Sequence, residues 1–275
     1  MVFFRAKSLL SILFAITLGA SFAFSQATTA TPAAAKPAAT PNAKNPAAPA
    51  SPEQIVESSI IIYAFPGGRE TLNQIRKTTF ERGRITVTDA QGKSESASYR
   101  RWVLRAATLN KEKIRIDQDY PSSRYSLVLA DEQVYGIVNT TVFAPREDVK
   151  NSFLNGIFHG IEALFRYKEN ESKIELAGRE KLMGVEYFMI DITDKQDRKT
   201  RFYVSVKSFR VMMLDYQDGG VKYRRKFYNH NYAQGTLFPF RTILTANGKT
   251  VEETDVSTIT FGQKVDEALF REIKP

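Results

Sequence analysis

The pattern of hydrophobic and polar positions changes its period near residue 78. Before that point, the apolar residues of 55–63 recur at helical spacing behind the capping-box sequence SPEQ at 51–54. This pattern predicts a first helix over about 52–64, ended by the PGG at 66–68. The segment RETLNQIR at 69–76 predicts a further short turn of helix.

From residue 78 onward, apolar and polar residues alternate with a period of two, which is typical of strands with one buried face. Turn signals interrupt the alternation, among them Asp218-Gly219-Gly220 and the hairpin pair Asn247-Gly248. We count about ten or eleven strands at hairpin spacing. This indicates a mainly β (α+β) protein with one large antiparallel sheet, which would curl and need helices to cover its inner face.

The segment NSFLNGIFHGIEALFRY at 151–167 is the one long amphipathic helix that the sequence predicts inside the strand-rich region. His159 falls on its polar side together with Asn155, Glu162 and Arg166, so we expect a solvated surface histidine. Gly156 and Gly160 are unusual in a static core helix, and we expect a cover that can shift. Its apolar stripe consists of Phe153, Leu154, Ile157, Phe158, Ile161, Leu164 and Phe165.

The first fifty residues have a different character. Residues 1–27 combine a basic start, an uncharged apolar run and small residues at cleavage spacing, which is the form of a secretory signal peptide. Residues 28–52 are almost entirely Ala, Pro, Thr, Asn and Lys, so this segment should be a disordered tether. The domain proper is then 53–275, exported to the periplasm and tethered to the inner membrane if the signal is not cleaved.

Composition narrows the function classes. The net charge of +9 falls to +5 from Glu53 onward, with basic residues scattered along strands, so we expect no nucleic acid as partner. The chain has no cysteine, which excludes thiol catalysis, disulfides and cysteine-ligated metals. It also excludes a lipid-modified N-terminal cysteine.

Candidate catalytic chemistry is sparse. The only histidines are His159 and His230, neither in a ligand-spaced set, and no nucleophile-elbow, zinc-protease or phosphate-loop motif is present. We place His230 in a polar loop after a strand. The aspartates at 191, 194, 197 and 215 suggest ordinary turn or surface chemistry more than a calcium site. We therefore expect no enzyme, no metal site and no cofactor.

Four stretches in order carry a resemblance to a known family. They are the helix leading into YAFPGGRETLNQIRKTTFERGRITV, the pair KIELAGREKLMGVEYFMIDIT, the proline-containing bend GTLFPFRTIL and the closing VDEALFREI. Together they span about 53–275, and their order and spacing resemble the LolA-like family of periplasmic lipoprotein carriers and outer-membrane lipoprotein-sorting proteins. The chain lacks the lipobox cysteine of the anchored receptors with this fold, and its long Ala/Pro tether is not part of the common pattern.

The resemblance implies an unclosed antiparallel half-barrel whose concave apolar face takes up acyl chains of lipids or lipoproteins. Such a carrier would be a monomer that exchanges cargo with donor and acceptor proteins at membranes. We expect the stripe of 151–167 to line its cavity, and Met183 and Met212 to contribute if they face inward. The strand residues expected to join that stripe are Phe202, Val204, Val206 and Met213.

Two other functions stay open from the sequence. The same fold also serves as a periplasmic sensor or regulatory module that binds a partner protein. An enzyme that uses the cavity as its active site would require His159 or His230 beside a buried carboxylate.

Overall fold

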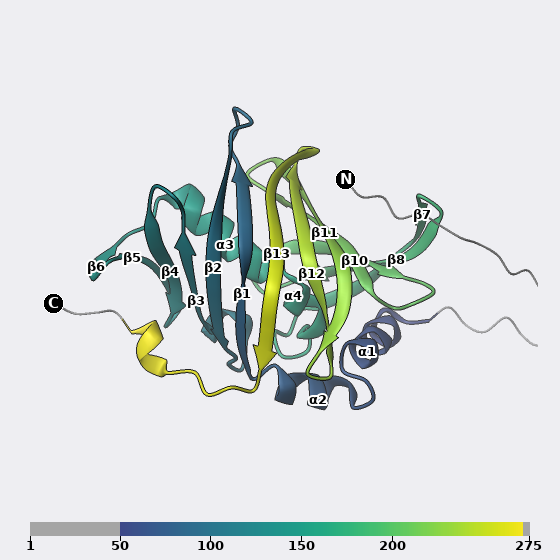
Figure 1. Cartoon of the computed structure of the whole chain (residues 1–275). Coiled ribbons are helices and arrows are strands. Elements are labelled where there is room, and N and C mark those ends of the chain that lie inside the picture. Colours follow the sequence, from purple (N-terminus) through teal and green to yellow (C-terminus); the bar gives the residue numbers. More distant parts are fainter. Residues whose placement is uncertain (1–49, 272–275) are drawn as a thin grey trace, which may run out of the picture. The chain divides into compact units, whose positions relative to one another are not determined.

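The structure is a computed structural model that describes residues 50–271. The expected signal peptide at 1–27 and nearly all of the expected tether lie outside the described residues. Within them, one antiparallel sheet of 13 strands remains open at both edges, as an unclosed half-barrel (Figure 1). The predicted fold class is confirmed, and the strand number exceeds the predicted ten or eleven.

The sheet consists of two sequential meanders. The first runs across six strands in chain order and ends in a strand of three residues, too short to give a periodic signal in the sequence. Its members are β1 (Thr78–Thr88), β2 (Ser94–Leu104), β3 (Lys113–Asp119), β4 (Arg124–Ala130), β5 (Gln133–Val138) and β6 (Thr141–Phe143).

The second meander follows the long helical connection. Its last strand, β13, pairs with β1, and this is the only pairing between neighbours that are distant in the sequence. The predicted hairpin turn at Asn247-Gly248 connects its last two strands. Its members are β7 (Lys173–Leu182), β8 (Val185–Thr193), β9 (Lys199–Ser205), β10 (Val211–Asp218), β11 (Val221–Ala233), β12 (Thr236–Ala246) and β13 (Lys249–Phe261).

The helix α1 (Pro52–Tyr63) begins at the predicted capping box. The hydroxyl of Ser51 accepts a hydrogen bond from the backbone of Gln54, whose side chain accepts one from the backbone of Ser51. The helix α2 (Gly68–Ile75) follows the glycine pair, as expected for a short second helix. The part of the chain that the structure describes contains no helix long and apolar enough to span a membrane.

The predicted helix over 151–167 is two helices. They are α3 (Glu147–Phe158) and α4 (Ile161–Phe165), and the chain between them leaves helical geometry at Gly160, whose backbone is extended. A side chain at this position would place its Cβ 2.8 Å from the carbonyl oxygen of Gly156. The glycine is therefore required by the close approach of two backbone segments.

The helices cover the two halves of the concave face differently. Over β7–β10 of the second meander, α1 and α4 pack closely, and Ile55, Leu164, Phe202 and Leu214 are buried in one core. Over the first meander, α3 packs through Ile157 against the neighbouring strands β3 and β4. A cavity remains between α3 and α4 and the middle of the sheet, lined by β1–β4 and β11–β13.

The outer face carries the end of the described chain. A short 3-10 helix, η2 (Glu267–Phe270), packs against β3 and β4 (Figure 1, yellow). The Arg115 guanidinium donates to the carbonyl oxygen of Leu269 at 3.0 Å, and the Tyr135 hydroxyl donates to that of Phe270 at 2.8 Å. The predicted closing turn at VDEALFREI is confirmed as a helical turn. A second 3-10 turn, η1 (Leu109–Lys111), connects β2 and β3.

Candidate functional site

A cavity of about 690 Å³ lies between the concave face and the helices α3 and α4. Its walls are strands β1–β4 of the first meander, with β11–β13 on the other side. This volume is in the range of sites that enclose most of a small ligand. The apolar lining is contributed by Ile85, Tyr99, Val103, Ile114, Ile116, Leu127, Phe153, Ile157, Ile161, Phe227 and Phe261.

The two ends of the cavity differ in exposure. At the end next to the β1–β2 turn, the lining residues Asp89, Ala90, Arg146 and Asp148 are exposed to solvent. At the other end, next to α2 and α4, Leu109 and most of its neighbours are buried. The opening therefore lies at the exposed end, where α3 begins.

The buried end contains charged side chains in hydrogen-bonded pairs. Arg76, only 3% exposed, donates to Glu162 at 2.5 Å and to the carbonyl oxygen of Leu237 at 2.8 Å. Arg105 also donates to Glu162, and at 2.8 Å to Asn73. Burial raises the pKa of Glu162, but the two guanidiniums outweigh it and hold that pKa at about 2. Glu162 is thus an anion that ties α4 to α2 and β2.

A second buried pair lies beside this cluster. Arg166, the residue after α4, donates to Glu112 and to the carbonyl oxygens of Ala106 and Ala107. Burial raises the pKa of Glu112 to about 7, with Arg166 acting in the opposite direction. The sequence pattern placed Glu162 and Arg166 on a solvated helix face, and this placement is wrong. Because the helix breaks at Gly160, the second segment turns these two side chains inward.

The predicted apolar stripe divides between cavity and core. Phe153, Ile157 and Ile161 line the cavity. Leu154 and Phe158 pack between α3 and the sheet instead. Leu164 and Phe165 lie fully within the core under α1, and so do Phe202 and Val204 from β9. Val206, just after β9, is half-buried against the same core.

The methionines lie away from the cavity. Met213 packs with Tyr187 and Tyr203 in a cluster on the outer face of the sheet, opposite to the side of Phe202 and Val204, and Met212 packs partly buried beside it. Met183 is 98% exposed in the β7–β8 turn. The sequence could not settle this, because β10 is apolar on both faces and its alternation does not indicate an inner side.

The placement of His159 on the helix surface is wrong. Its side chain is 4% exposed, and its Nδ1 lies 2.7 Å from the hydroxyl of Thr200. Burial lowers its pKa to about 4. It caps α3 at the helix break and therefore points into the sheet instead of into solvent.

His230 is also placed differently from the expected polar loop. It lies within β11, with its Nε2 3.4 Å from the hydroxyl of Tyr63. Burial lowers its pKa to about 4 as well. Neither histidine lines the cavity.

Three of the four aspartates singled out in the sequence, Asp191, Asp194 and Asp215, pair with basic side chains. Asp191 forms two hydrogen bonds with Arg201, at 2.7 and 2.8 Å, and Asp215 forms two with Arg224. Asp194 accepts the backbone N–H groups of its own turn at Gln196 and Arg198. Across residues 50–271, no cluster of three or more histidine or acidic side chains has the geometry of a metal site.

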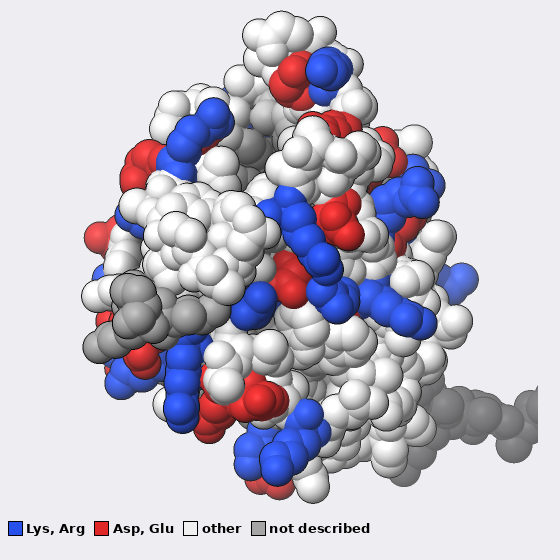
Figure 2. Space-filling view, turned by 60° about the vertical axis from the view of Figure 1, so that its left-hand side comes forward, with Lys and Arg blue, Asp and Glu red and all other residues white. Residues whose placement is uncertain are grey.

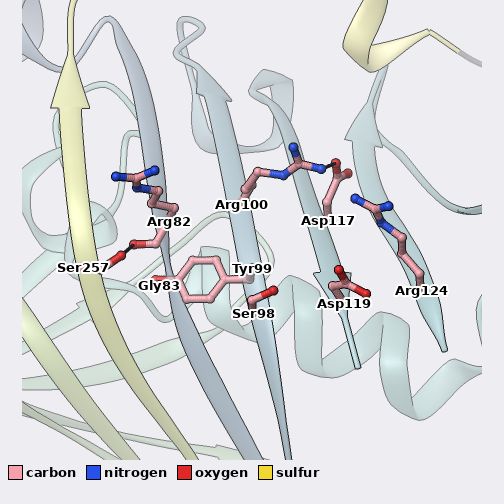
Figure 3. A pocket seen from close by; sticks show the side chains of 9 residues that line it. All are labelled: Arg82, Gly83, Ser98, Tyr99, Arg100, Asp117, Asp119, Arg124 and Ser257. Atoms are coloured by element: carbon pink, nitrogen blue, oxygen red, sulfur yellow. Dashed lines mark hydrogen bonds and ion pairs between the residues drawn. The ribbon is translucent and has the colours of Figure 1, made fainter. Parts of the chain in front are cut away.

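A second hollow of about 400 Å³ lies on the outer face of β1–β4, and the Tyr99 side chain beside it points from β2 toward Gly83 (Figure 3). Around it stand the exposed Arg82, Arg100 and Arg124. Arg100 pairs with Asp117 at 3.4 Å across the neighbouring strands. Gly83 sits at a bulge against β13, where a Cβ would meet the Asp255 carbonyl oxygen at 2.1 Å.

The charges on the one face shown in Figure 2 do not form a patch of one sign. On this face, basic and acidic side chains intermingle.

The sheet and cavity define an open antiparallel half-barrel with its helices on the concave side. Solved structures of the same architecture include a LolA superfamily protein from Nitrosomonas europaea, 13% identical, with a TM-score of 0.57 over 81% of this chain and 98% of that one. A DUF1329 family protein from Desulfovibrio piger matches with a TM-score of 0.58, also at 13% identity over 81% of this chain and 98% of that one.

A putative outer membrane lipoprotein-sorting protein domain from Vibrio parahaemolyticus matches with a TM-score of 0.53, at 15% identity over 74% of this chain and 92% of that one. The chain thus shares the fold of these solved structures, as its sequence resemblance implied. No family model and no curated protein sequence matches it.

Proposed function

We propose that this protein is an exported, non-enzymatic carrier that holds acyl chains of lipids or lipoproteins in the cavity under α3 and moves them between membranes in the periplasm. The observation that carries the proposal is the cavity of about 690 Å³, apolar along its strands and open at one end. The likeness in fold to a putative lipoprotein-sorting domain supports it.

Elementary energetics explains why such a carrier is needed. Exposing an acyl chain to water costs about 0.8 kcal/mol per methylene, so a sixteen-carbon chain costs roughly 12 kcal/mol. A cavity that offers a similar transfer free energy to the bilayer removes this barrier without holding the cargo irreversibly. Binding, release and exclusion of water suffice for this task, and no bond is made or broken.

The open half of the concave face is suited to uptake because its cover is separate from the main core. The helix α3 contacts β3 and β4 through Ile157 and neighbouring apolar side chains. Its Gly156 lines the cavity, and a Cβ added there would meet no described atom within 4 Å. A side chain added at this position would therefore begin in open space beside the cavity.

This gives a direct test. The Gly156→Phe variant should fill the cavity, whereas the matched Asn151→Phe variant puts the same ring on the exposed side of α3. We expect native mass spectrometry of periplasmic wild-type protein and of Asn151→Phe to reveal a co-purifying lipid, and Gly156→Phe to be depleted of it. Wild-type protein that is lipid-free and binds no acyl ligand would contradict the carrier function. So would a Gly156→Phe protein that is folded and equally loaded.

A further inference from the structure

The cavity is lined by five arginines, which differ in their distance to the nearest carboxylate oxygen. Four of them have a carboxylate oxygen within 3.3 Å: Arg76 and Arg105 at Glu162, Arg146 at Asp148, and Arg225 at Glu252. The fifth, Arg101 on β2, has its nearest carboxylate oxygen, from Glu81, at 3.9 Å. That distance is an electrostatic contact and is too long for a hydrogen bond.

Glu81 is held by another residue. It faces Arg101 across the β1–β2 ladder, and its Oε1 accepts a hydrogen bond from the Tyr99 hydroxyl. The Glu81 side chain is 7% exposed, whereas that of Arg101 is 36% exposed. Within residues 50–271, the Arg101 guanidinium makes no hydrogen bond, so its N–H donors are available to the cavity.

Apolar residues neighbour Arg101 on the cavity wall. Val103 follows it on the same face of β2, and Ile116 is its partner residue on β3. Ile157 of α3 covers the same strands from above. The N–H donors of Arg101 are thus available at one point of an otherwise apolar wall. They are suited to bind an amphiphile whose polar end carries an acceptor oxygen.

We propose that Arg101 binds the acceptor group at the polar end of an acyl chain, a carboxylate or an ester carbonyl, while the chain lies along the apolar wall. This inference rests on the proposed carrier function and adds to it the orientation and chemical class of the ligand. Glu81 neutralises Arg101 while the cavity is empty, and it competes with the ligand because both offer oxygen acceptors to one guanidinium.

Two variants and one control test the role of Arg101. Arg101→Leu removes the donors and keeps an apolar wall. Glu81→Gln removes the competing charge and still accepts from Tyr99. Arg100→Leu is the matched control, because Arg100 is the adjacent residue on the outer face, where it pairs with Asp117. Circular dichroism and thermal unfolding would confirm that each variant is folded.

Calorimetric titration with three twelve-carbon probes separates the possibilities. Dodecanoate offers a carboxylate, monododecanoylglycerol an ester carbonyl, and dodecyltrimethylammonium a cation without an acceptor. We expect Arg101→Leu to weaken the binding of dodecanoate, of monododecanoylglycerol or of both by about tenfold or more. The affinity for dodecyltrimethylammonium should be unchanged or higher. Loss confined to dodecanoate identifies a free acid, and loss of both identifies a carbonyl oxygen. Glu81→Gln should tighten dodecanoate severalfold, and Arg100→Leu should change nothing.

The opposite results are equally clear. If Arg101→Leu weakens all three probes alike, or weakens neither of the two acceptors, Arg101 does not bind the polar end, even though the carrier function stands. If Glu81→Gln fails to tighten dodecanoate, the competition is contradicted. Wild-type protein that binds none of the three probes would contradict the carrier function itself, and the role of Arg101 with it.

Discussion

The imidazole ring of His159 lies parallel to the phenol ring of Tyr216, with the ring centroids 4.2 Å apart and 5° between the planes. His159 ends α3, and Tyr216 lies on β10 in the second meander. The stack fixes the end of α3 on one meander while the rest of the helix covers the other. The cover of the cavity is therefore anchored at the helix break.

This anchor predicts a loss of stability in mild acid. Burial lowers the pKa of both histidines from 6.5 to about 4, with Arg198 adding to the effect at His159 and Arg210 at His230. Between these pH values the unfolded chain binds protons that the folded protein does not. The histidines therefore contribute stability that is fully present above pH 6.5 and is lost as the pH falls toward 4.

Each histidine should account for about 1.4 kcal/mol per pH unit within that window. Urea unfolding of wild type and of His159→Gln at pH 7 and pH 5 isolates the loss due to His159, because the raised pKa of Glu112 acts in the opposite direction equally in both proteins. The His159→Gln variant should lose less stability than wild type between the two pH values. If His159→Gln and wild type lose equal stability between the two pH values, the buried neutral state of His159 is wrong.

The two glycines of the α3–α4 segment should respond oppositely to alanine. Gly156 is helical with free space around it, so Gly156→Ala should raise the free energy of unfolding by up to about 1 kcal/mol. Gly160→Ala should lower it, because the new Cβ would press on the carbonyl oxygen of Gly156. Denaturant unfolding of the two single variants compares them, and equal effects would contradict the helix break.

The Gly156→Ala variant also tests whether α3, which covers the cavity, moves. If α3 must bend for cargo to pass, Gly156→Ala should stiffen it and slow the exchange of a bound fluorescent fatty acid. Stopped-flow exchange that is no slower than in wild type would count against a moving cover.

Arg76 should be among the most sensitive positions for stability. Arg76→Met removes the donors to Glu162, Thr236 and the Leu237 carbonyl group in a nearly dry environment. Breaking a buried charged network commonly costs about 3 kcal/mol or more. The control is Lys173→Met, which breaks the exposed pair with Glu175 and should leave thermal unfolding unchanged. A similar small effect at both sites would show that the buried network contributes little.

Phe153 and Met213 separate ligand binding from stability. Phe153→Ala should weaken acyl-chain binding because it removes part of the cavity wall. Met213→Ala should lower the free energy of unfolding by about 2 kcal/mol and leave the affinity unchanged, because Met213 packs on the outer face. Fluorescent fatty-acid titration and urea unfolding of both variants provide the comparison. Weaker binding by folded Met213→Ala would contradict this division.

The sequence predicted the fold well because its signals were local. The capping box at Ser51, the hairpin at Asn247-Gly248 and the long alternating runs depend on neighbours in the chain, and the structure confirms them. The shortest strand, β6, has three residues, which are too few to show an alternating pattern in the sequence.

The candidate site was harder to predict because it depends on non-local packing. The single stripe of 151–167 gave no sign that Leu164 and Phe165 would enter the core while Ile157 stays at the cavity. Arg76 and Arg101 point inward, but which side of their segments faces inward depends on strand pairing and on where the helices pack. Neither can be read from the local sequence. The alternation of Tyr99, Arg101 and Val103 on one face of β2 was the available signal for that wall.

The strand order has a consequence for the synthesis of the chain. Because β13 alone joins the two meanders, the wall of the cavity lacks its central strand until residues 249–261 have emerged. The first meander and α3 are made long before, with apolar residues such as Ile85 facing no completed enclosure. A chain made from its N-terminus can therefore enclose a ligand only after nearly all of it has been synthesised, so the cavity is complete only at the end of synthesis.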